Sequence, residues 1–244
     1  MNRAKIVDYA KVYKGEVDKL VRTDPRKHSL LEFIVFFPSW YKHLNNGSSP
    51  VQDELPWITF PAIRFLEKRL AKDMVIYEFG SGGSTLFFTK RVKQVYSVEH
   101  DPDWFRTVSD ALQTKGCSTW SGRLIEPIYG DDYLQRSPSD PNADVSGSPA
   151  FKGYSFKGYV ESIDEFPDEY FDLILIDGRA RPSCFRHAIP KVKAEGCIMW
   201  DNTERSYYLQ DIQPLQGPLL RVDFPGPGPY VPFFTQTSIW LKQK

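Results

Sequence analysis

Short apolar segments alternate with amphipathic segments through most of the chain beyond residue 70. Helical spacing follows several of the apolar segments, and strands that alternate with helices are typical of a parallel sheet with right-handed crossovers. The pattern therefore predicts an α/β fold. The five strands that it predicts are Val75–Phe79, Gln94–Val98, Arg123–Tyr129, Phe171–Ile176 and Cys197–Trp200.

Two regions depart from this alternation. Residues 137–158 are rich in loop-forming residues, and a connection of that length is usually either functional or disordered. The last two apolar segments, Leu219–Phe224 and Thr237–Leu241, are joined by a Pro- and Gly-rich stretch without a helix. We expect these two strands to pair antiparallel at one edge of the sheet.

The first 55 residues are expected to be helical. Apolar residues from Ile6 to Val21 recur at helical intervals, and a further helix is predicted over residues 59–70. The Asn- and Ser-rich stretch at 45–50 indicates a loop. We expect a helical N-terminal extension over residues 1–55, followed by one α/β domain over residues 56–244.

Composition limits the class of protein. The chain has 244 residues, and its 31 Lys and Arg side chains balance 31 Asp and Glu side chains. It therefore lacks the basic surplus of a non-specific nucleic-acid binder, and we expect no nucleic-acid partner. With 41% hydrophobic and 25% charged residues, it has the composition of a packed globular protein rather than a disordered one.

Cysteine usage and hydropathy indicate the compartment. Cys117, Cys184 and Cys197 are far apart and form no C-x-x-C pair, which argues against a disulfide framework or a zinc knuckle. No apolar run approaches the ~20 residues of a membrane helix, and the N-terminal region shows no secretory pattern. We expect a cytoplasmic protein without a membrane span.

The strongest local motif lies between the first predicted strand and its helix. It reads Glu78-Phe79-Gly80-Ser81-Gly82-Gly83-Ser84-Thr85, and Glu99 follows at the end of the next strand. Glycines let the backbone approach a ligand closely, a helix N-terminus offers free N–H groups, and an acid one strand away can accept both hydroxyls of a ribose. The motif therefore predicts a nucleoside-containing ligand.

Two details favour S-adenosylmethionine over a nicotinamide dinucleotide. In a dinucleotide fingerprint a third glycine admits the pyrophosphate, and that position is Thr85 in this chain. Glu78, on the first strand, would repel a pyrophosphate but suits an ammonium or sulfonium group. An NAD-dependent oxidoreductase stays as the less favoured alternative.

From Pro56 to Leu241 the chain resembles the class I S-adenosylmethionine-dependent methyltransferases. The resemblance rests on four features: E-F-G-S-G-G-S-T (78–85), S-V-E-H-D (97–101), F-D-L-I-L-I-D-G (171–178) and the antiparallel C-terminal pair, which distinguishes this fold from dehydrogenases. It implies a Rossmann-like, seven-stranded and mostly parallel sheet with helices on both faces. We expect the N-terminal extension to cap the cofactor.

The resemblance assigns roles to the motif residues. Gly80 and Gly82 would border the methionine half of the cofactor, Glu78 would face its amino group, and Glu99 would accept its ribose hydroxyls. One residue of each of two pairs would lie near the adenosine: His100 or Asp101, and Asp131 or Asp132. The cofactor-binding set is then Glu78, Gly80, Ser81, Gly82, Gly83, Ser84, Glu99, His100, Asp132 and Asp177.

A second group of polar residues lies at the ends of the fourth and fifth predicted strands. Asp177 ends the fourth, and Asp201 and Asn202 end the fifth. Adjacent strands are ~4.8 Å apart, so these oxygens can converge at the carboxyl edge of the sheet. Three hard oxygen donors suit Mg²⁺ or Ca²⁺. The alternative is that Asp177 and Asn202 bind backbone N–H groups and cofactor, while Asp201 is solvated.

This second group resembles the divalent-metal-dependent O-methyltransferases of the catechol and caffeoyl-coenzyme A type. The resemblance implies Asp177, Asp201 and Asn202 as metal ligands and catalytic residues. Those enzymes commonly have a Lys just after the strand-four Asp, whereas this chain has Arg179 and Arg181 there. Arginine stays protonated and cannot act as a base, although it can clamp a carboxylate or phosphate. A bound metal would lower the pKa of an acceptor hydroxyl without a side-chain base.

We therefore expect an S-adenosylmethionine-dependent methyltransferase that methylates an oxygen of a small hydroxylated acceptor, assisted by Mg²⁺ or another divalent cation. Arg179, Arg181 and Tyr207 are expected to contact the acceptor. Three alternatives stay open: a metal-independent N- or O-methyltransferase, the oxidoreductase, and a cofactor-binding protein without turnover.

Overall fold

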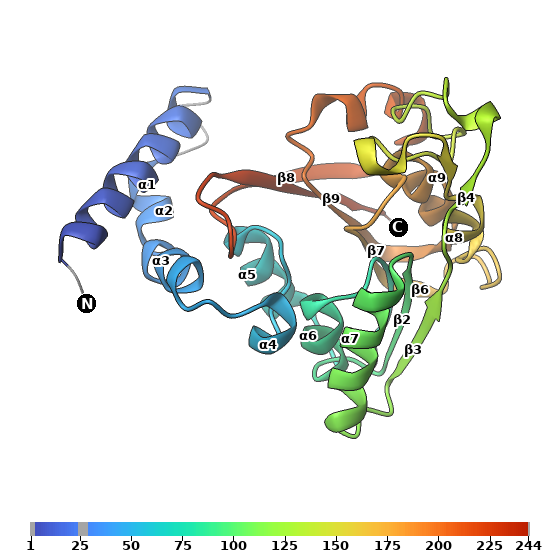
Figure 1. Ribbon diagram of the computed structural model, residues 1–244, viewed down its shortest axis with the longest axis horizontal. Helices are drawn as coiled ribbons and strands as arrows, with labels where there is room; N and C mark the ends of the chain where they lie inside the picture. Colours follow the sequence, from blue (N-terminus) through green and yellow to red (C-terminus); the bar gives the residue numbers. More distant parts are fainter. Residues whose placement is uncertain (1–2, 24–28, 244) are drawn as a thin grey trace.

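The centre of the molecule is a seven-stranded sheet, seen in a computed structural model that describes residues 3–23 and 29–243 (Figure 1). Its strand order is β3-β2-β1-β6-β7-β9-β8. The first five of these strands run parallel, and β9 pairs antiparallel with both β7 and β8. The strands are β1 Val75–Phe79, β2 Gln94–Glu99, β3 Trp120–Leu124, β6 Phe171–Ile176, β7 Val192–Asp201, β8 Leu220–Gly226 and β9 Thr235–Leu241.

The predicted α/β class and the antiparallel C-terminal pair are confirmed, but two predicted strands were wrong in their bounds. The fifth strand was expected over Cys197–Trp200, whereas β7 already begins at Val192. The third strand was expected over Arg123–Tyr129, whereas β3 ends at Leu124. Pro127 has no N–H to donate to a ladder, which separates the two halves of that apolar segment. Its second half is β4, Ile128–Tyr129, which pairs with β5, Tyr154–Ser155, in a small separate sheet.

Helices cover both faces of the large sheet, and strand residues alternate between the two cores. Ile174 and Ile176 of β6 pack on the side of α8 and α9, whereas Leu173 and Leu175 pack on the side of α5 and α6. This alternation follows from the two-residue period of a strand. The helices are α1 Arg3–Thr23, α2 Leu30–Ile34, α3 Phe37–Asn45, α4 Pro50–Asp53, α5 Phe60–Arg69, α6 Gly83–Thr89, α7 Pro102–Thr114, α8 Lys157–Glu161 and α9 Arg181–Lys191.

The N-terminal helices pack against the turn between β8 and β9 (Figure 1). The indole Nε1 of Trp40 donates to Val231 O (3.0 Å), and the Phe234 N–H donates to Glu16 (3.0 Å). The carboxylate of Asp53 accepts the Tyr230 hydroxyl at 2.8 Å. Helices are thus present before Pro56 as expected, while the division of the chain at residue 55 stays a prediction. Residues 24–28 of that expected extension lie outside the described residues.

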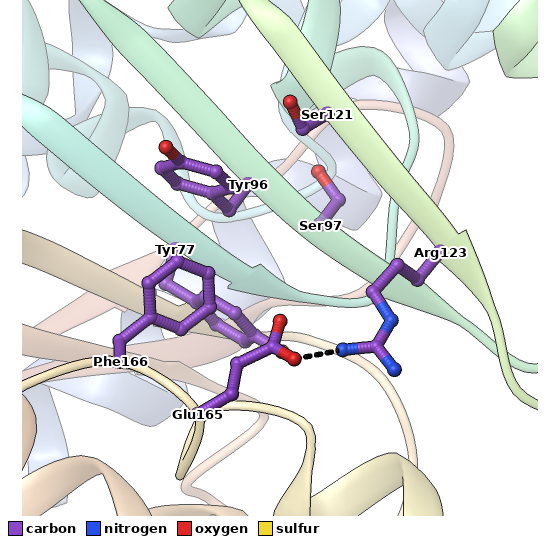
Figure 2. A pocket seen from close by; sticks show the side chains of 7 residues that line it. All are labelled: Tyr77, Tyr96, Ser97, Ser121, Arg123, Glu165 and Phe166. Atoms are coloured by element: carbon purple, nitrogen blue, oxygen red, sulfur yellow. Dashed lines mark hydrogen bonds and ion pairs between the residues drawn. The ribbon is translucent and has the colours of Figure 1, made fainter.

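A hollow of about 230 Å³ lies beside β1, β2 and β3 (Figure 2). The connection between β3 and β6 contains α8, which has five residues and is too short to cover these strands. Figure 2 shows aromatic rings on one side of the hollow and an ion pair between Arg123 and Glu165, 2.5 Å apart, on the other. The lining residues are Tyr77, Tyr96, Ser97, Ser121, Arg123, Glu165 and Phe166.

Within the described residues, no helix has both the length and the apolar character needed to cross a membrane.

Gly83, the first residue of α6, packs directly against α4 and the chain that follows it. A Cβ at this position would overlap the carbonyl oxygens of Pro50 and Leu55. We expect Gly83→Ala to lower the free energy of unfolding by about 1–3 kcal/mol, measured by urea denaturation, because neither backbone oxygen can move aside cheaply.

Gly15→Ala is the matched control for this substitution. Gly15 lies inside α1 with nothing within 4 Å of its added Cβ. The control should raise the free energy of unfolding by about 0.5–1 kcal/mol, because alanine favours a helix interior. Equal unfolding midpoints for Gly83→Ala and the parent chain would show that α4 and the segment after it do not pack on the start of α6.

Candidate active site

The candidate site lies where the strand order reverses, between β1 and β6. The chain leaves β1 toward α6 on one face of the sheet and leaves β6 toward α9 on the other. In open α/β sheets the crevice at this place, beyond the carboxyl ends of the strands, is where ligands bind. The turn after β1 and the turn after β6 are in contact. A Cβ on Gly80, whose φ is +100°, would lie only 3.1 Å from the Cα of Gly178. The glycine loop after β1 and the turn after β6 therefore form one continuous edge at the carboxyl ends of the strands.

The carboxylate of Glu99 joins the glycine loop to the end of β2. Its Oε2 accepts the Ser81 N–H at 3.0 Å, and its Oε1 accepts the N–H groups of His100 (2.7 Å) and Asp101 (3.1 Å). Burial alone would raise the pKa of Glu99, but the His100 ring and these N–H groups outweigh it and lower the pKa. Glu99 is therefore a buried, charged acceptor directly beside the loop.

His100 stands between the two halves of the edge. Its Nδ1 lies 2.6 Å from Glu99 Oε1, and its Nε2 accepts from Arg179 Nε at 3.3 Å. The His100 ring packs against Phe151 and Tyr159, with centroids 5.2 and 6.2 Å apart. The predicted residues Glu99, His100 and Arg179 thus form one chain of contacts.

Several residues of this edge were missed from the sequence. Trp104, in the first turn of α7, donates its indole Nε1 to Ser81 O at 2.7 Å and lies beside Gly82. Phe151 reaches His100 from the long 137–158 connection. The spacing of neither residue forms a motif. A usable signal for Trp104 was its place three residues after Asp101, which caps α7 by accepting the Asp103 and Trp104 N–H groups.

Glu78 lies beneath the glycine loop and is 0% exposed. Its Oε2 accepts the hydroxyls of Thr85 (2.7 Å) and Ser97 (2.9 Å), while Oε1 is buried without a well-formed hydrogen bond. Burial raises the pKa of Glu78 to about 7, although the hydroxyls of Ser84, Thr85 and Ser97 favour its charged form. Glu78 therefore places a titratable negative charge under the loop.

The structure brings Asp177 and Asp201 to adjacent strand ends, with Arg181 between them. Arg181 Nη2 donates to Asp177 Oδ1 at 3.1 Å, and Nη1 donates to the backbone oxygen of Asp201 at 2.5 Å. Asp201 Oδ1 accepts the Thr237 hydroxyl at 2.6 Å. Asn202 follows with a left-handed backbone, φ 59°.

This arrangement does not fit a divalent cation. A permanent guanidinium cation already holds one oxygen of Asp177, and Arg cannot lose its proton to make room. Beyond this predicted set of two carboxylates and one amide, the part of the chain that the structure describes contains no group of three or more His, Cys, Asp or Glu side chains placed to hold a metal.

Two predicted contacts are placed away from the centre of this edge. Asp132 lies in an exposed 3₁₀ turn, Asp131–Tyr133, and no hydrogen bond or ion pair in the described ranges joins it to Glu99 or His100. Tyr207 packs on Tyr208 with ring centroids 4.4 Å apart. It is Tyr208 whose ring lies 5.5 Å from the Arg181 guanidinium. The acceptor role of Tyr207 stays a prediction.

Comparison with known proteins identifies the fold. No known family model and no curated protein sequence matches the chain. Among solved structures, the O-methyltransferase TomG of Streptomyces achromogenes, involved in tomaymycin synthesis and solved in complex with S-adenosylmethionine, is similar with a TM-score of 0.55 at 12% identity, over 84% of this chain and 95% of that one. A proposed O-methyltransferase from Klebsiella pneumoniae has a TM-score of 0.53 at 16% identity, over 96% of this chain and 99% of that one.

The chain has the class I methyltransferase fold. The seven-stranded, mostly parallel sheet and the antiparallel β8–β9 pair are the features that the sequence resemblance implied. At these identities the likeness shows the fold, and the roles of individual residues rest on the geometry of this chain.

The buried carboxyl of Glu78 should make stability depend on pH. Its pKa is raised from 4.5 to about 7 in the folded state, so the fold is favoured most below pH 4.5 and loses stability as the pH rises to about 7. We expect the free energy of unfolding of Glu78→Gln, relative to the parent chain, to rise by roughly 3 kcal/mol across that range.

Urea unfolding at about pH 5, 6, 7 and 8 measures this difference, since an uncharged glutamine carries no such pH dependence. Glu67→Gln, at an exposed position on α5, is the control and should follow the parent chain at every pH. A constant difference between Glu78→Gln and the parent chain would contradict the raised pKa.

Proposed function

We propose that this protein is an S-adenosylmethionine-dependent methyltransferase that transfers the sulfonium methyl group to an oxygen of a small hydroxylated acceptor. The observation that carries the proposal is the convergence, at the β1/β6 reversal, of the glycine loop, the charged Glu99 and Asp177. The solved neighbours support it, since both carry the name O-methyltransferase and TomG was solved with S-adenosylmethionine.

In the proposal, the cofactor lies across the glycine loop from Glu99 toward Asp177. Glu99 accepts the ribose hydroxyls, which replace the Ser81 N–H as donors to its carboxylate. Trp104 and His100 form walls beside the adenosine, because both already border the loop or Glu99. Glu78 lies below the loop and favours the ammonium and sulfonium charges through its own negative charge.

The proposed reaction is an in-line displacement. The acceptor oxygen forms a bond to the methyl carbon while the bond from that carbon to sulfur breaks, which gives a methyl ether, S-adenosylhomocysteine and a proton. The chain contributes alignment of donor and acceptor, which can supply much of the rate. Asp177, whose side chain is 25% exposed at the strand end, can accept a hydrogen bond from the acceptor hydroxyl.

The metal-independent alternative is favoured over metal assistance. Arg181 holds Asp177 and the end of β7, so the proposed reaction uses no divalent cation. The nicotinamide alternative is disfavoured because Glu78 would repel a pyrophosphate at the loop. We also propose a cytoplasmic location and an acceptor other than nucleic acid, in line with the neutral net charge.

Cofactor binding tests the first half of the proposal. We expect the parent chain to bind S-adenosylhomocysteine in a calorimetric titration and not to bind NADH. Glu99→Gln should weaken S-adenosylhomocysteine binding by roughly 10-fold or more, because a charged acceptor of two hydroxyls is replaced by a neutral amide.

Asp110→Asn is the control for this experiment, since Asp110 is an exposed acid on α7. It should bind S-adenosylhomocysteine as the parent chain does. Binding of NADH without S-adenosylhomocysteine would replace the methyltransferase proposal by the oxidoreductase alternative.

Transfer of a labelled methyl group tests the second half. We expect S-adenosylmethionine with a tritiated methyl group to label members of a panel of small phenols and alcohols, detected by extraction and scintillation counting. The same assay with total RNA and with a matched panel of amines should give no label above background. Label in RNA or in the amines alone would contradict the proposed acceptor class.

A further inference from the structure

Arg181 is a buried cation at an unfavourable place. It is the first residue of α9, yet it is only 7% exposed. The N–H groups at the start of a helix already carry partial positive charge, so a cation there is disfavoured. Ala180 before it adopts a left-handed backbone, φ 46°, in the turn between β6 and α9. A buried cation in this position requires strong compensation from its neighbours.

That compensation comes from oxygens of the candidate acceptor site. Nε donates to Gly178 O at 3.0 Å, and Nη2 donates to Asp177 Oδ1 at 3.1 Å. Nη1 donates to Asp201 O at 2.5 Å. One guanidinium group therefore ties the end of β6, the turn that follows it and the end of β7. A planar group with several fixed donors suits this task, which a lysine could not perform.

Arginine keeps its proton in proteins, and the Asp177 carboxylate oxygen lies 3.1 Å from Nη2. The Tyr208 ring, 5.5 Å from the guanidinium, shields it further. The positive charge at this point is therefore permanent.

Asp177 Oδ1, which accepts from Arg181, is one of the side-chain oxygens that a divalent cation would need. A metal bound by Asp177 and Asp201 would lie beside a charge that cannot be neutralised, and the two cations would repel each other. The geometry points to Arg181 as the resident cation of the acceptor site, standing in the place of a divalent metal and holding Asp177 and the end of β7 in position. Arg181 is then a positioning residue, because it acts through Asp177 and β7.

This inference rests on the proposed function and narrows its acceptor class. A metal ion recognises an acceptor through two neighbouring oxygens that bind it together, as in a vicinal diol. With the guanidinium on Asp177 Oδ1, the partly exposed carboxylate binds the acceptor through hydrogen bonds rather than through a metal. The site therefore does not require two neighbouring oxygens on the acceptor, and an acceptor with one isolated hydroxyl group suits it.

Manganese binding, followed by electron paramagnetic resonance after dialysis against EDTA, tests the inference. We expect the parent chain to leave Mn²⁺ free in solution. Arg181→Met removes the charge at similar side-chain length and should create a Mn²⁺ site, with affinity increased by roughly tenfold or more. The added substitution Asp201→Asn should abolish that site.

Arg186→Met is the matched control, because Arg186 lies on the same helix but donates to Pro141 O instead. It should leave Mn²⁺ free. A parent chain that binds Mn²⁺ and loses it on Asp201→Asn would overturn the inference, as would a folded Arg181→Met variant without a Mn²⁺ site. If circular dichroism shows that Arg181→Met does not fold, the comparison of the parent chain with Asp201→Asn decides alone.

Calorimetry with S-adenosylhomocysteine on the same samples separates this inference from the proposed function. The parent chain should bind S-adenosylhomocysteine equally well in EDTA and in MgCl₂ if Arg181 replaces the metal. Binding that requires MgCl₂ would overturn the inference while leaving the methyltransferase proposal intact. Absence of S-adenosylhomocysteine binding in both solutions would contradict the proposed function, and the manganese result would still decide the role of Arg181.

Discussion

The candidate site depends on the pairing of the buried charge of Glu99. A buried carboxylate costs a large free energy unless donors surround it, and its donors come from the loop after β1 and from the end of β2. The folded state must therefore hold Ser81, His100 and Asp101 together. Arg181, on the other side of the strand reversal, is a buried cation and needs hydrogen-bond acceptors, which the ends of β6 and β7 provide. Two compensated charges of opposite sign thus define the two halves of one edge.

Much of the fold could be predicted because its central strands are buried on both faces. β1 and β6 have almost continuous apolar sequence, and both were predicted with their observed bounds. β3 lies at the sheet edge and has no buried residue, so its apolar signal is weak and the stronger segment beyond Leu124 was mistaken for it. Edge strands have fewer buried apolar residues, and buried apolar residues are the pattern from which strands are predicted.

The positions of site residues could be predicted only where elements close in sequence determine them. A strand, a turn, a helix and a second strand place Glu99 beside the glycine loop whatever the rest of the chain does. The place of Arg181 depends on the left-handed turn at Ala180, and Phe151 reaches His100 through the packing of a long connection. Neither has a spacing rule. The sequence predicted an acidic edge suited to a metal. In our proposal, the Arg181 side chain takes the place of that metal.

The contacts between the N-terminal helices and the β8–β9 turn have a consequence for the order of folding. Trp40 and Val231 are 191 residues apart, and Glu16 and Phe234 are 218 apart. During synthesis the N-terminal helices leave the ribosome first, but the turn that covers their aromatic side emerges among the last segments. Contacts this distant form late, because the intervening chain must be ordered first. The helices made first therefore reach their final packing only when the C-terminal hairpin is complete.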